Sequence, residues 1–458
     1  MSDAAAAKPQ KKSRRVDLTT GPVHKHLIRM ALPMTLGIAA SMSFTFVDNY
    51  FIAQLGTDEV AAMGFVTRVA MIIVAVSIGM GAGVTSVIAR VAGNGDQDEI
   101  KKLATNTLIL TFLVSIAVTI FGLMTVDPLF RAMGADDSVM PMIKEYIHIW
   151  YFTALFIIFP MTGSAIMRAL GDTKLQGKIM LYSAFGNAVL DPLLIFGLYG
   201  FPELGLAGAA WASLITRFVS FAYILYSLQF EFHVICFKGD TLEDFTKSVR
   251  RIMHVGIPAT GTNMIIPIVQ AMIIALVATY GNNAVAATHL ATTIEMLALV
   301  IFFALSAVVG PFLGQNLGAN NFERIDECIT KVMLFCLAFG AVSAVVLGLF
   351  ATELAGLFRD EADIVNLARA YLIYVPISYG LYGMVMSVNA MFNAIGKPMP
   401  GVMISSLRVF FLQLPLFYFA SQYYDLETAF IFISASNAIA GIVAYIWIKS
   451  AINKLRST

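Results

Sequence analysis

The sequence predicts an all-α polytopic membrane protein in which twelve transmembrane helices form two parallel six-helix repeats around a central cleft. Three observations predict this fold. Of the 458 residues, 58% are hydrophobic and 13% are charged, with a mean hydropathy of +0.78, whereas soluble proteins carry about 25% charged residues. Apolar stretches long enough to cross a hydrocarbon core of about 30 Å follow one another along the chain. The two halves of the chain also match each other in sequence.

The apolar stretches predict twelve spans, because each crossing helix needs about 20 apolar residues. We expect them at 27–55, 60–92, 104–126, 143–170, 176–199, 206–229, 250–280, 284–317, 330–357, 366–395, 401–422 and 428–448. The first stretch is too long for a secretory signal and no small-residue cleavage pattern follows it, so we expect it to remain as a membrane helix. The three cysteines show no CxxC spacing, so they predict neither a disulfide framework nor a zinc site.

Charge along the chain predicts how the helices are oriented. Basic residues precede the first span and recur at alternate connections, for example at Lys101, Lys174 and Lys247, while the other connections are mostly acidic. Basic connections are cytoplasmic by the positive-inside rule. We therefore expect both termini in the cytoplasm of a bacterium, with the protein in the inner membrane. Residues 1–22 are expected to form a disordered cytoplasmic tail.

An internal repeat divides the chain. A shift of 225 positions superposes residues at equivalent turns, including Pro33 on Pro258, Gly93 on Gly318 and Gly171 on Gly396. Each copy holds six spans, so both enter the membrane from the same side, as in transporters that bind their cargo between halves. We expect an N-lobe with helices 1–6 and a C-lobe with helices 7–12, over 23–230 and 250–458, joined by a cytoplasmic linker at 231–249.

Two acidic residues distinguish the first repeat from the second. Asp48 is matched by Ile273, and Asp191 by Leu416. Each acid lies eight residues before the outer end of its expected helix, so both sit about 12 Å below that end. A carboxyl group at membrane depth is costly unless it faces a cavity, pairs or takes up a proton. Two at one depth predict a cation-coupling site.

Several other residues are candidates for the same site or for a second one. Asn187 lies one helical turn from Asp191, and the hydroxyl groups of Tyr146 and Ser213 can reach a similar depth. Pro33 removes a backbone hydrogen bond from the first helix, which can bend there. Glu295 is an acid deep in the second half, suited to substrate, to a second cation, or to a purely structural contact.

The alternative for Asp48 and Asp191 is a structural ion pair. Arg68 and Arg217 lie inside the expected spans and could neutralise either acid.

The chain resembles the multidrug and toxic compound extrusion family from about Val23 to Trp447. The segments that carry the resemblance include "ALPMTLGIAASMSFTFVDNYFIAQLGTDEVAAMG", "MRALGDTKLQGKIM", "GNAVLDPLLIFG" and "GPFLGQNLGANN". The resemblance implies a secondary active antiporter that exports cationic or amphipathic drugs and toxic organic compounds by alternating access. It also implies that the first helix bends as the protein works.

The resemblance further points to one branch of that family. That branch has its cation site in the N-lobe, with an Asp on the first helix and an Asn-x-x-x-Asp pair on the fifth, which match Asp48, Asn187 and Asp191. Another branch holds sodium in the C-lobe through acids on the seventh and tenth helices. Those acids are missing here, where the tenth helix carries Tyr371, Tyr374 and Asn389.

The coupling ion is expected to be the proton. Sodium is the alternative, because hard cations favour the oxygen ligands of Asp48, Asn187 and Asp191. We expect no cofactor and no firm metal site. No Walker-type glycine loop occurs, so ATP is not the direct energy source.

Small organic molecules and the bilayer are the expected partners, with no nucleic acid, and the protein is expected to be a monomer. A lipid-linked oligosaccharide flippase of the same architecture is the main competing hypothesis, because flippases commonly line their cleft with basic residues. An intramembrane aspartyl protease is disfavoured, because neither acid lies in a Gly-x-Gly-Asp motif. No enzymatic activity is therefore expected.

Overall fold

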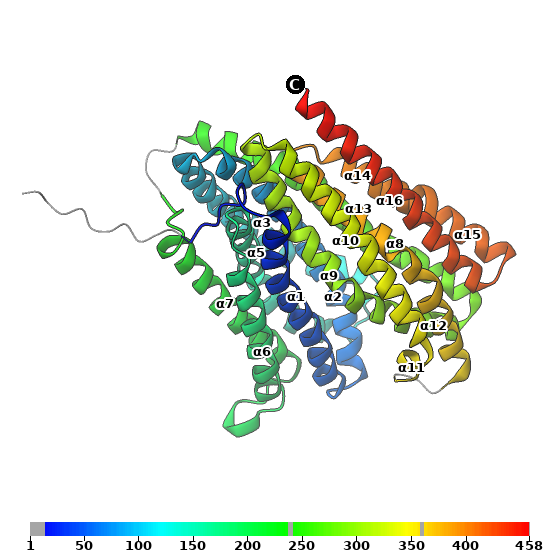
Figure 1. Ribbon diagram of the computed structural model, residues 1–458. Helices are drawn as coiled ribbons and strands as arrows, with labels where there is room; N and C mark the ends of the chain where they lie inside the picture. Colours follow the sequence, from blue (N-terminus) through cyan, green and yellow to red (C-terminus); the bar gives the residue numbers. More distant parts are fainter. Residues whose placement is uncertain (1–13, 237–240, 358–360, 458) are drawn as a thin grey trace, which may run out of the picture.

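The computed structural model describes residues 14–236, 241–357 and 361–457, and within these ranges the chain is helical with no β-strand. Figure 1 shows long helices packed side by side, with the first repeat coloured blue to green and the second green through yellow to red. The α-helices are α1 (Val23–Ala53), α2 (Thr57–Asn94), α3 (Gln97–Ala132), α4 (Met140–Phe152), α5 (Ala154–Ala169), α6 (Lys174–Ile195), α7 (Gly205–Phe230), α8 (Leu242–Val277), α9 (Asn282–Gly318), α10 (Phe322–Leu349), α11 (Ala351–Gly356), α12 (Ala362–Tyr374), α13 (Tyr379–Ala394), α14 (Met399–Ser406), α15 (Leu414–Tyr423) and α16 (Leu426–Arg456).

The described chain contains the predicted number of membrane spans. Eleven helical segments are long and apolar enough to cross a membrane, and α4 with α5 forms a twelfth span that is bent by 42°. The bend lies at Thr153, whose hydroxyl donates to the carbonyl of Ile149 at 2.9 Å, and such back-bonding often bends helices. Counting this pair as one span confirms the prediction of twelve.

The two repeats meet at a pseudo-symmetric crossing of α2 and α9. Gly93 lies against the carbonyl oxygen of Gln315, and its repeat mate Gly318 lies against that of Arg90, which is the repeat mate of Gln315. A Cβ atom at either glycine would collide with the opposite backbone. The repeated glycines therefore allow the two lobes to approach closely. The two lobes are related to each other by a pseudo-symmetry axis that runs along the helices.

The lobes have separate hydrophobic cores. One core is built from α2–α7 and the other from α9–α16. The first half of α1 joins the second core through Leu27, Met30 and Met34, although Pro33 also packs its carbonyl against Gly177 of α6. Helix α1 thus contacts both lobes, and a change in its shape would be felt by each of them.

Both ends of the described chain lie on one face, beside the start of α8 and the part of α3 that it contacts (Figure 1). We call this the terminal face and define it by residues 14–22, 99–102, 231–236, 241–251 and 449–457. Arg14 forms ion pairs of 2.6 Å with Asp172 and with Glu231 of the N-lobe. A few residues later, Gln315 of the C-lobe accepts a hydrogen bond from the Leu18 amide at 3.0 Å.

The predicted disordered tail is wrong for residues 14–22, because these bonds hold the chain against both lobes. Residues 1–13, the rest of that prediction, lie outside the described residues.

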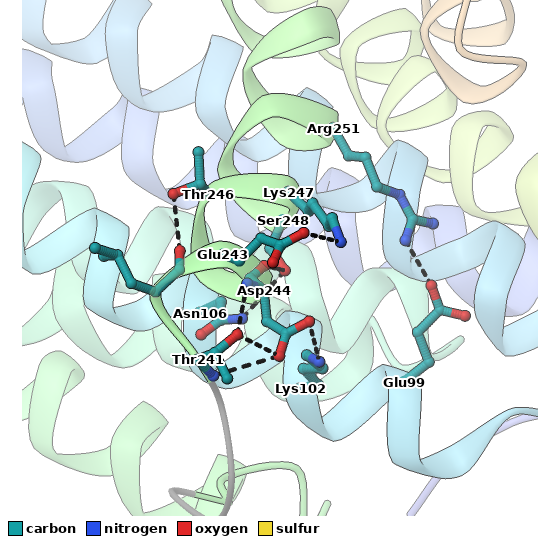
Figure 2. Close-up of polar contacts among 11 residues, drawn as sticks. Glu99, Lys102, Asn106, Thr241, Glu243, Asp244, Thr246, Lys247, Ser248 and Arg251 are labelled. Carbon is teal, nitrogen blue, oxygen red and sulfur yellow. Dashed lines mark hydrogen bonds and ion pairs between the residues drawn. The ribbon is translucent and has the colours of Figure 1, made fainter.

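The linker between the lobes is shorter than expected. Helix α8 begins at Leu242 rather than at 250, because Thr241 and Asp244 form a reciprocal capping box. Figure 2 shows that the first turns of α8 lie against α3 of the N-lobe. Lys102 pairs with Asp244 at 2.9 Å, and Arg251 pairs with Glu99 at 2.6 Å. The terminal face is therefore a site of polar contact between the lobes.

Candidate functional site

The structure brings the two predicted N-lobe acids together. Asp191 on α6 is fully buried, with a relative exposure of 0%, and neither of its carboxylate oxygens has a hydrogen-bond partner among the described residues. Asp48 on α1 is half-buried and lies close enough to interact electrostatically with Asp191. An uncompensated carboxylate in such surroundings favours binding a proton or a cation.

Tyr146 and Asn187 lie around these acids as predicted. Tyr146 is buried on α4 and interacts electrostatically with both Asp48 and Asp191. Asn187 is buried one turn before Asp191 on α6. Its side-chain oxygen accepts a hydrogen bond of 2.5 Å from the hydroxyl of Thr216. The cluster therefore joins residues of α1, α4, α6 and α7.

Thr216 is a site residue that sequence reasoning missed. The residue predicted from this helix, Ser213, is buried on α7 three positions earlier. The two residues share a helix face, so the face was predicted correctly and the hydroxyl that contacts Asn187 was not. Thr216 could have been identified from the sequence because it lies about as deep in the membrane as Asn187.

The structure argues against a structural ion pair at the acids. Arg217 on α7 interacts electrostatically with Asp48, but its Nη1 atom is buried without a hydrogen-bond partner. Arg68 is exposed. Among the ion pairs of the described residues, none joins Asp48 or Asp191 to either arginine.

The N-lobe cluster offers oxygen ligands of the kind that hard cations prefer. Asp48, Asp191 and the bonded amide of Asn187 contribute carboxylate and carbonyl oxygens, which suit a proton or a sodium ion. Within residues 14–236, 241–357 and 361–457, no group of three or more His, Cys, Asp or Glu side chains is arranged to hold a metal ion. A transported sodium ion would therefore need the Asn187 oxygen or a hydroxyl as well as the two acids.

Pro33 lies in the interior of α1, which continues as one helix from Val23 to Ala53. It is distant in sequence from Asp48 but on the same helix, so bending at Pro33 would move Asp48 relative to α6. That bending stays a prediction.

The C-lobe acid has a different environment. The Glu295 carboxylate on α9 accepts a hydrogen bond from the hydroxyl of Tyr371 at 2.6 Å and interacts electrostatically with Arg408. Arg408 was not predicted. It lies in a π-helical segment, Leu407–Gln413, between α14 and α15, and such segments frequently mark functional sites.

A cavity of about 440 Å³ lies between the lobes. The N-lobe contributes Met34, Arg168 and Gln176 to its lining, and the C-lobe contributes residues that include Phe303 and Arg408. Asp48, Asn187, Asp191 and Glu295 are not among the described lining residues. The acids and the cavity are therefore two separate parts of the molecule.

The chain matches known proteins over nearly its whole length. The family model MatE matches twice, over residues 33–193 and 258–419. The chain is 32% identical to a protein of Shewanella oneidensis named FAD transporter, over 94% of this chain and 95% of that protein. It is 25% identical to the probable multidrug resistance protein YoeA of Bacillus subtilis, over 88% and 89%. The Shewanella relative is thus named as a transporter, and the Bacillus relative as a probable multidrug resistance protein.

The fold also matches a solved structure. The Vibrio cholerae MATE transporter VcmN in the bent form superposes with a TM-score of 0.89 at 30% sequence identity, over 94% of this chain and 97% of that chain. The double match of the family model repeats the 225-residue period and confirms the two-repeat architecture.

Proposed function

Because this chain belongs to the MatE family, the multidrug and toxic compound extrusion transporters, we propose that it is a cation-coupled antiporter that exports amphipathic organic molecules. The coupling ion is the proton, with sodium as the alternative. The ion binds in the N-lobe at Asp48 and Asp191, with Asn187 as a neutral ligand. The cargo binds in the cavity between the lobes.

The observation that carries this proposal is the buried Asp191 carboxylate, which has no hydrogen-bond partner and lies near Asp48. Taking up a cation removes one negative charge from this pair, so the N-lobe has two states that differ in charge. Each charge that moves inward through 100 mV gains about 2.3 kcal/mol. That energy is available to drive cargo outward.

Helix α1 is the element that transmits the change. It carries Asp48, contacts both cores and contains Pro33. Neutralising Asp48 alters its attraction to Arg217, and α1 responds by bending at Pro33, where one backbone hydrogen bond is missing. The bend changes the N-lobe side of the cavity and releases cargo.

Orientation and assembly complete the proposal. The terminal face carries Arg14, Lys102 and Arg251, and these basic residues support a cytoplasmic position for this face in a bacterial inner membrane. Both lobes that line the cavity belong to one chain, which supports a monomer as the working unit.

The cargo has two candidates. The multidrug name of the Bacillus relative favours drug-like organic cations. The FAD transporter name of the Shewanella relative, with higher identity, favours flavin adenine dinucleotide.

The test is efflux from right-side-out membrane vesicles or proteoliposomes loaded with ethidium or with FAD. A pH gradient and a sodium gradient are imposed separately on the parent protein, on Asp48→Asn and on Arg68→Gln as an exposed control. We expect the pH gradient to drive efflux of at least one cargo, and Asp48→Asn to abolish it while Arg68→Gln has little effect. Efflux driven by sodium alone would assign the same site to sodium. Efflux that is unchanged in Asp48→Asn would contradict the proposed coupling site.

A further inference from the structure

We propose that the cavity between the lobes contains an anion-binding subsite formed by Arg168 and Arg408, which takes the phosphate of an amphipathic, water-soluble organic molecule. This inference rests on the proposed export function, because it assigns a chemical class to the cargo in the same cavity. It adds to that proposal two residues and the charge that they give the cavity.

The charge of the lining is the first observation. Among the described residues that line the cavity, the charged ones are Arg168 and Arg408, and no acidic residue is present. Ser, Thr, Asn and Gln side chains and Tyr382 supply the other polar side-chain atoms. A cavity walled by apolar groups strengthens electrostatic interactions with whatever enters it. The field from two guanidinium groups therefore attracts an anion and repels a cation.

Arg168 carries a positive charge that forms no ion pair with an acid of the described chain. It lies at the end of α5, and its Nη1 atom donates to the side-chain oxygen of Gln176 at 2.7 Å. Gln176 is a neutral amide that also lines the cavity. The ion pairs of the described residues include none with Arg168. A half-buried guanidinium with only a neutral partner is compensated best by a bound anion.

Arg408 is held firmly but is not fully satisfied. Its Nη1 donates to the Asn437 side-chain oxygen at 3.1 Å, and its guanidinium lies 4.4 Å from the centre of the Tyr382 ring. Its Nε atom is buried without a hydrogen-bond partner. Glu295 attracts it from a distance, but the Glu295 carboxylate is bonded to Tyr371. Neutral groups thus hold Arg408 in one orientation, and its positive charge remains available to bind a ligand.

The two arginines are not a product of the internal repeat. The repeat mate of Arg168 is Asn393, and that of Arg408 is Ser183. Packing that both lobes share therefore does not explain either charge. One arginine comes from each lobe, so a molecule that contacts both links the lobes across the cavity.

The remaining wall suits the apolar part of such a cargo. Met34, Met161, Met180, Phe303 and Met386 line the cavity, and thioethers pack well against planar rings. The volume of about 440 Å³ falls within the usual range of pockets for small organic ligands. Guanidinium groups bind phosphate through paired hydrogen bonds. The combination selects a molecule with a ring system at one end and a phosphate at the other.

Binding tests the subsite without requiring transport. Flavin fluorescence anisotropy is measured on protein in nanodiscs with riboflavin 5′-phosphate and with riboflavin, which differ by one phosphate. We expect the phosphate ester to bind at least about tenfold more tightly than riboflavin, and Arg168→Gln and Arg408→Gln each to weaken it about tenfold. Riboflavin should change little in either variant. Ethidium binding should be unchanged or tighter, because a positive charge has been removed.

Controls separate charge from folding. Arg168→Lys and Arg408→Lys keep the charge and should retain part of the preference for the phosphate ester. Arg68→Gln, an exposed site outside the cavity, should match the parent protein. Melting temperature and elution profile identify any variant that fails to fold. Equal binding of riboflavin and its phosphate by the parent, or equal loss of all three probes in the glutamine variants, would overturn the proposal.

A lipid headgroup is the other source of the same chemistry. Polyprenyl pyrophosphate is therefore added to the nanodiscs as a competitor of riboflavin 5′-phosphate. If this lipid is the only phosphate compound that displaces the flavin, the subsite belongs to a lipid substrate and the proposal of a water-soluble cargo is refuted. If Asp48→Asn loses gradient-driven efflux but binds riboflavin 5′-phosphate normally, the variant has lost ion coupling and kept the phosphate subsite. The two proposals therefore fail independently.

Discussion

The same tyrosine position has opposite surroundings in the two lobes. Tyr146 and Tyr371 are repeat mates. In the N-lobe, Tyr146 lies near Asp48 and Asp191, and the Asp191 oxygens have no hydrogen-bond partner. In the C-lobe, Tyr371 donates directly to Glu295, which also faces Arg408.

The difference shows how a duplicated fold acquires a division of labour. A carboxylate that already accepts a hydrogen bond near a guanidinium gains little from a bound cation. A buried carboxylate with no partner gains a great deal. The fold is common to both lobes, but among the described residues the buried carboxylate without a hydrogen-bond partner lies in the N-lobe cluster.

The largest expected effect separates the acids of the two lobes. Asp191→Asn should reduce gradient-driven efflux by about tenfold or more, which corresponds to about 1.4 kcal/mol, because the amide cannot release a proton. Glu295→Gln should reduce it less than about threefold, since Gln can still accept from Tyr371. Initial efflux rates at equal protein amounts measure both. A larger loss in Glu295→Gln than in Asp191→Asn would reverse the assignment of roles.

Stability should change in opposite directions when each acid is replaced by its repeat mate. Asp191→Leu removes an uncompensated polar group and should raise the apparent melting temperature in detergent. Glu295→Ala leaves the Tyr371 hydroxyl without its acceptor and should lower the apparent melting temperature. Each shift should correspond to about 1–3 kcal/mol in the free energy of unfolding. Thermal unfolding followed by tryptophan fluorescence measures the shifts. A fall in both variants would show that Asp191 is a structural residue.

A smaller effect is expected within the N-lobe cluster. Thr216→Val removes the donor to Asn187 and keeps the shape of the side chain, so Asn187 is no longer held in place. Efflux should fall a few-fold, in line with about 1 kcal/mol for a hydrogen bond. Ser213→Ala on the same helix is the matched control and should have a weaker effect. Dye efflux across a range of driving gradients distinguishes the two variants.

The smallest effect is expected at the contact between the lobes on the terminal face. Arg251→Glu replaces the pair with Glu99 by repulsion and should change the transport rate by no more than about 1 kcal/mol, because the pair is partly exposed. Adding Glu99→Arg restores opposite charges and should return the rate toward that of the parent. A double-mutant cycle of efflux rates at low and high salt measures the coupling. Failure of the second change to restore the rate would show that this pair does not hold the lobes.

Much of the fold was predictable because it follows from properties that can be read along the chain. Hydropathy predicted twelve spans, and the 225-residue period predicted two lobes with the same orientation. Helix ends were less predictable. Helix α8 begins earlier than expected because of a local capping box, and residues 14–22 are ordered by bonds to distant residues such as Gln315.

The candidate site was predictable only in part. The depth of Asp48, Asp191 and Asn187 followed from their distance to the helix ends, and the structure places them together. Thr216 and Arg408 were missed, because which side chain faces a partner depends on helix rotation and on the π-helical segment before α15. The acceptor of the Tyr371 hydrogen bond could not be read from its position either.

The sequence by itself determined that this protein is a two-repeat membrane transporter with its distinctive acids in the first repeat, since hydropathy, period and depth are properties of the linear chain. The tertiary structure alone decided which of those acids is satisfied and what charge the central cavity carries. Arg168 and Arg408 are 240 positions apart in the sequence and line one cavity. The reason is physical: depth in the membrane follows from residue spacing, whereas contacts between helices depend on how the lobes pack.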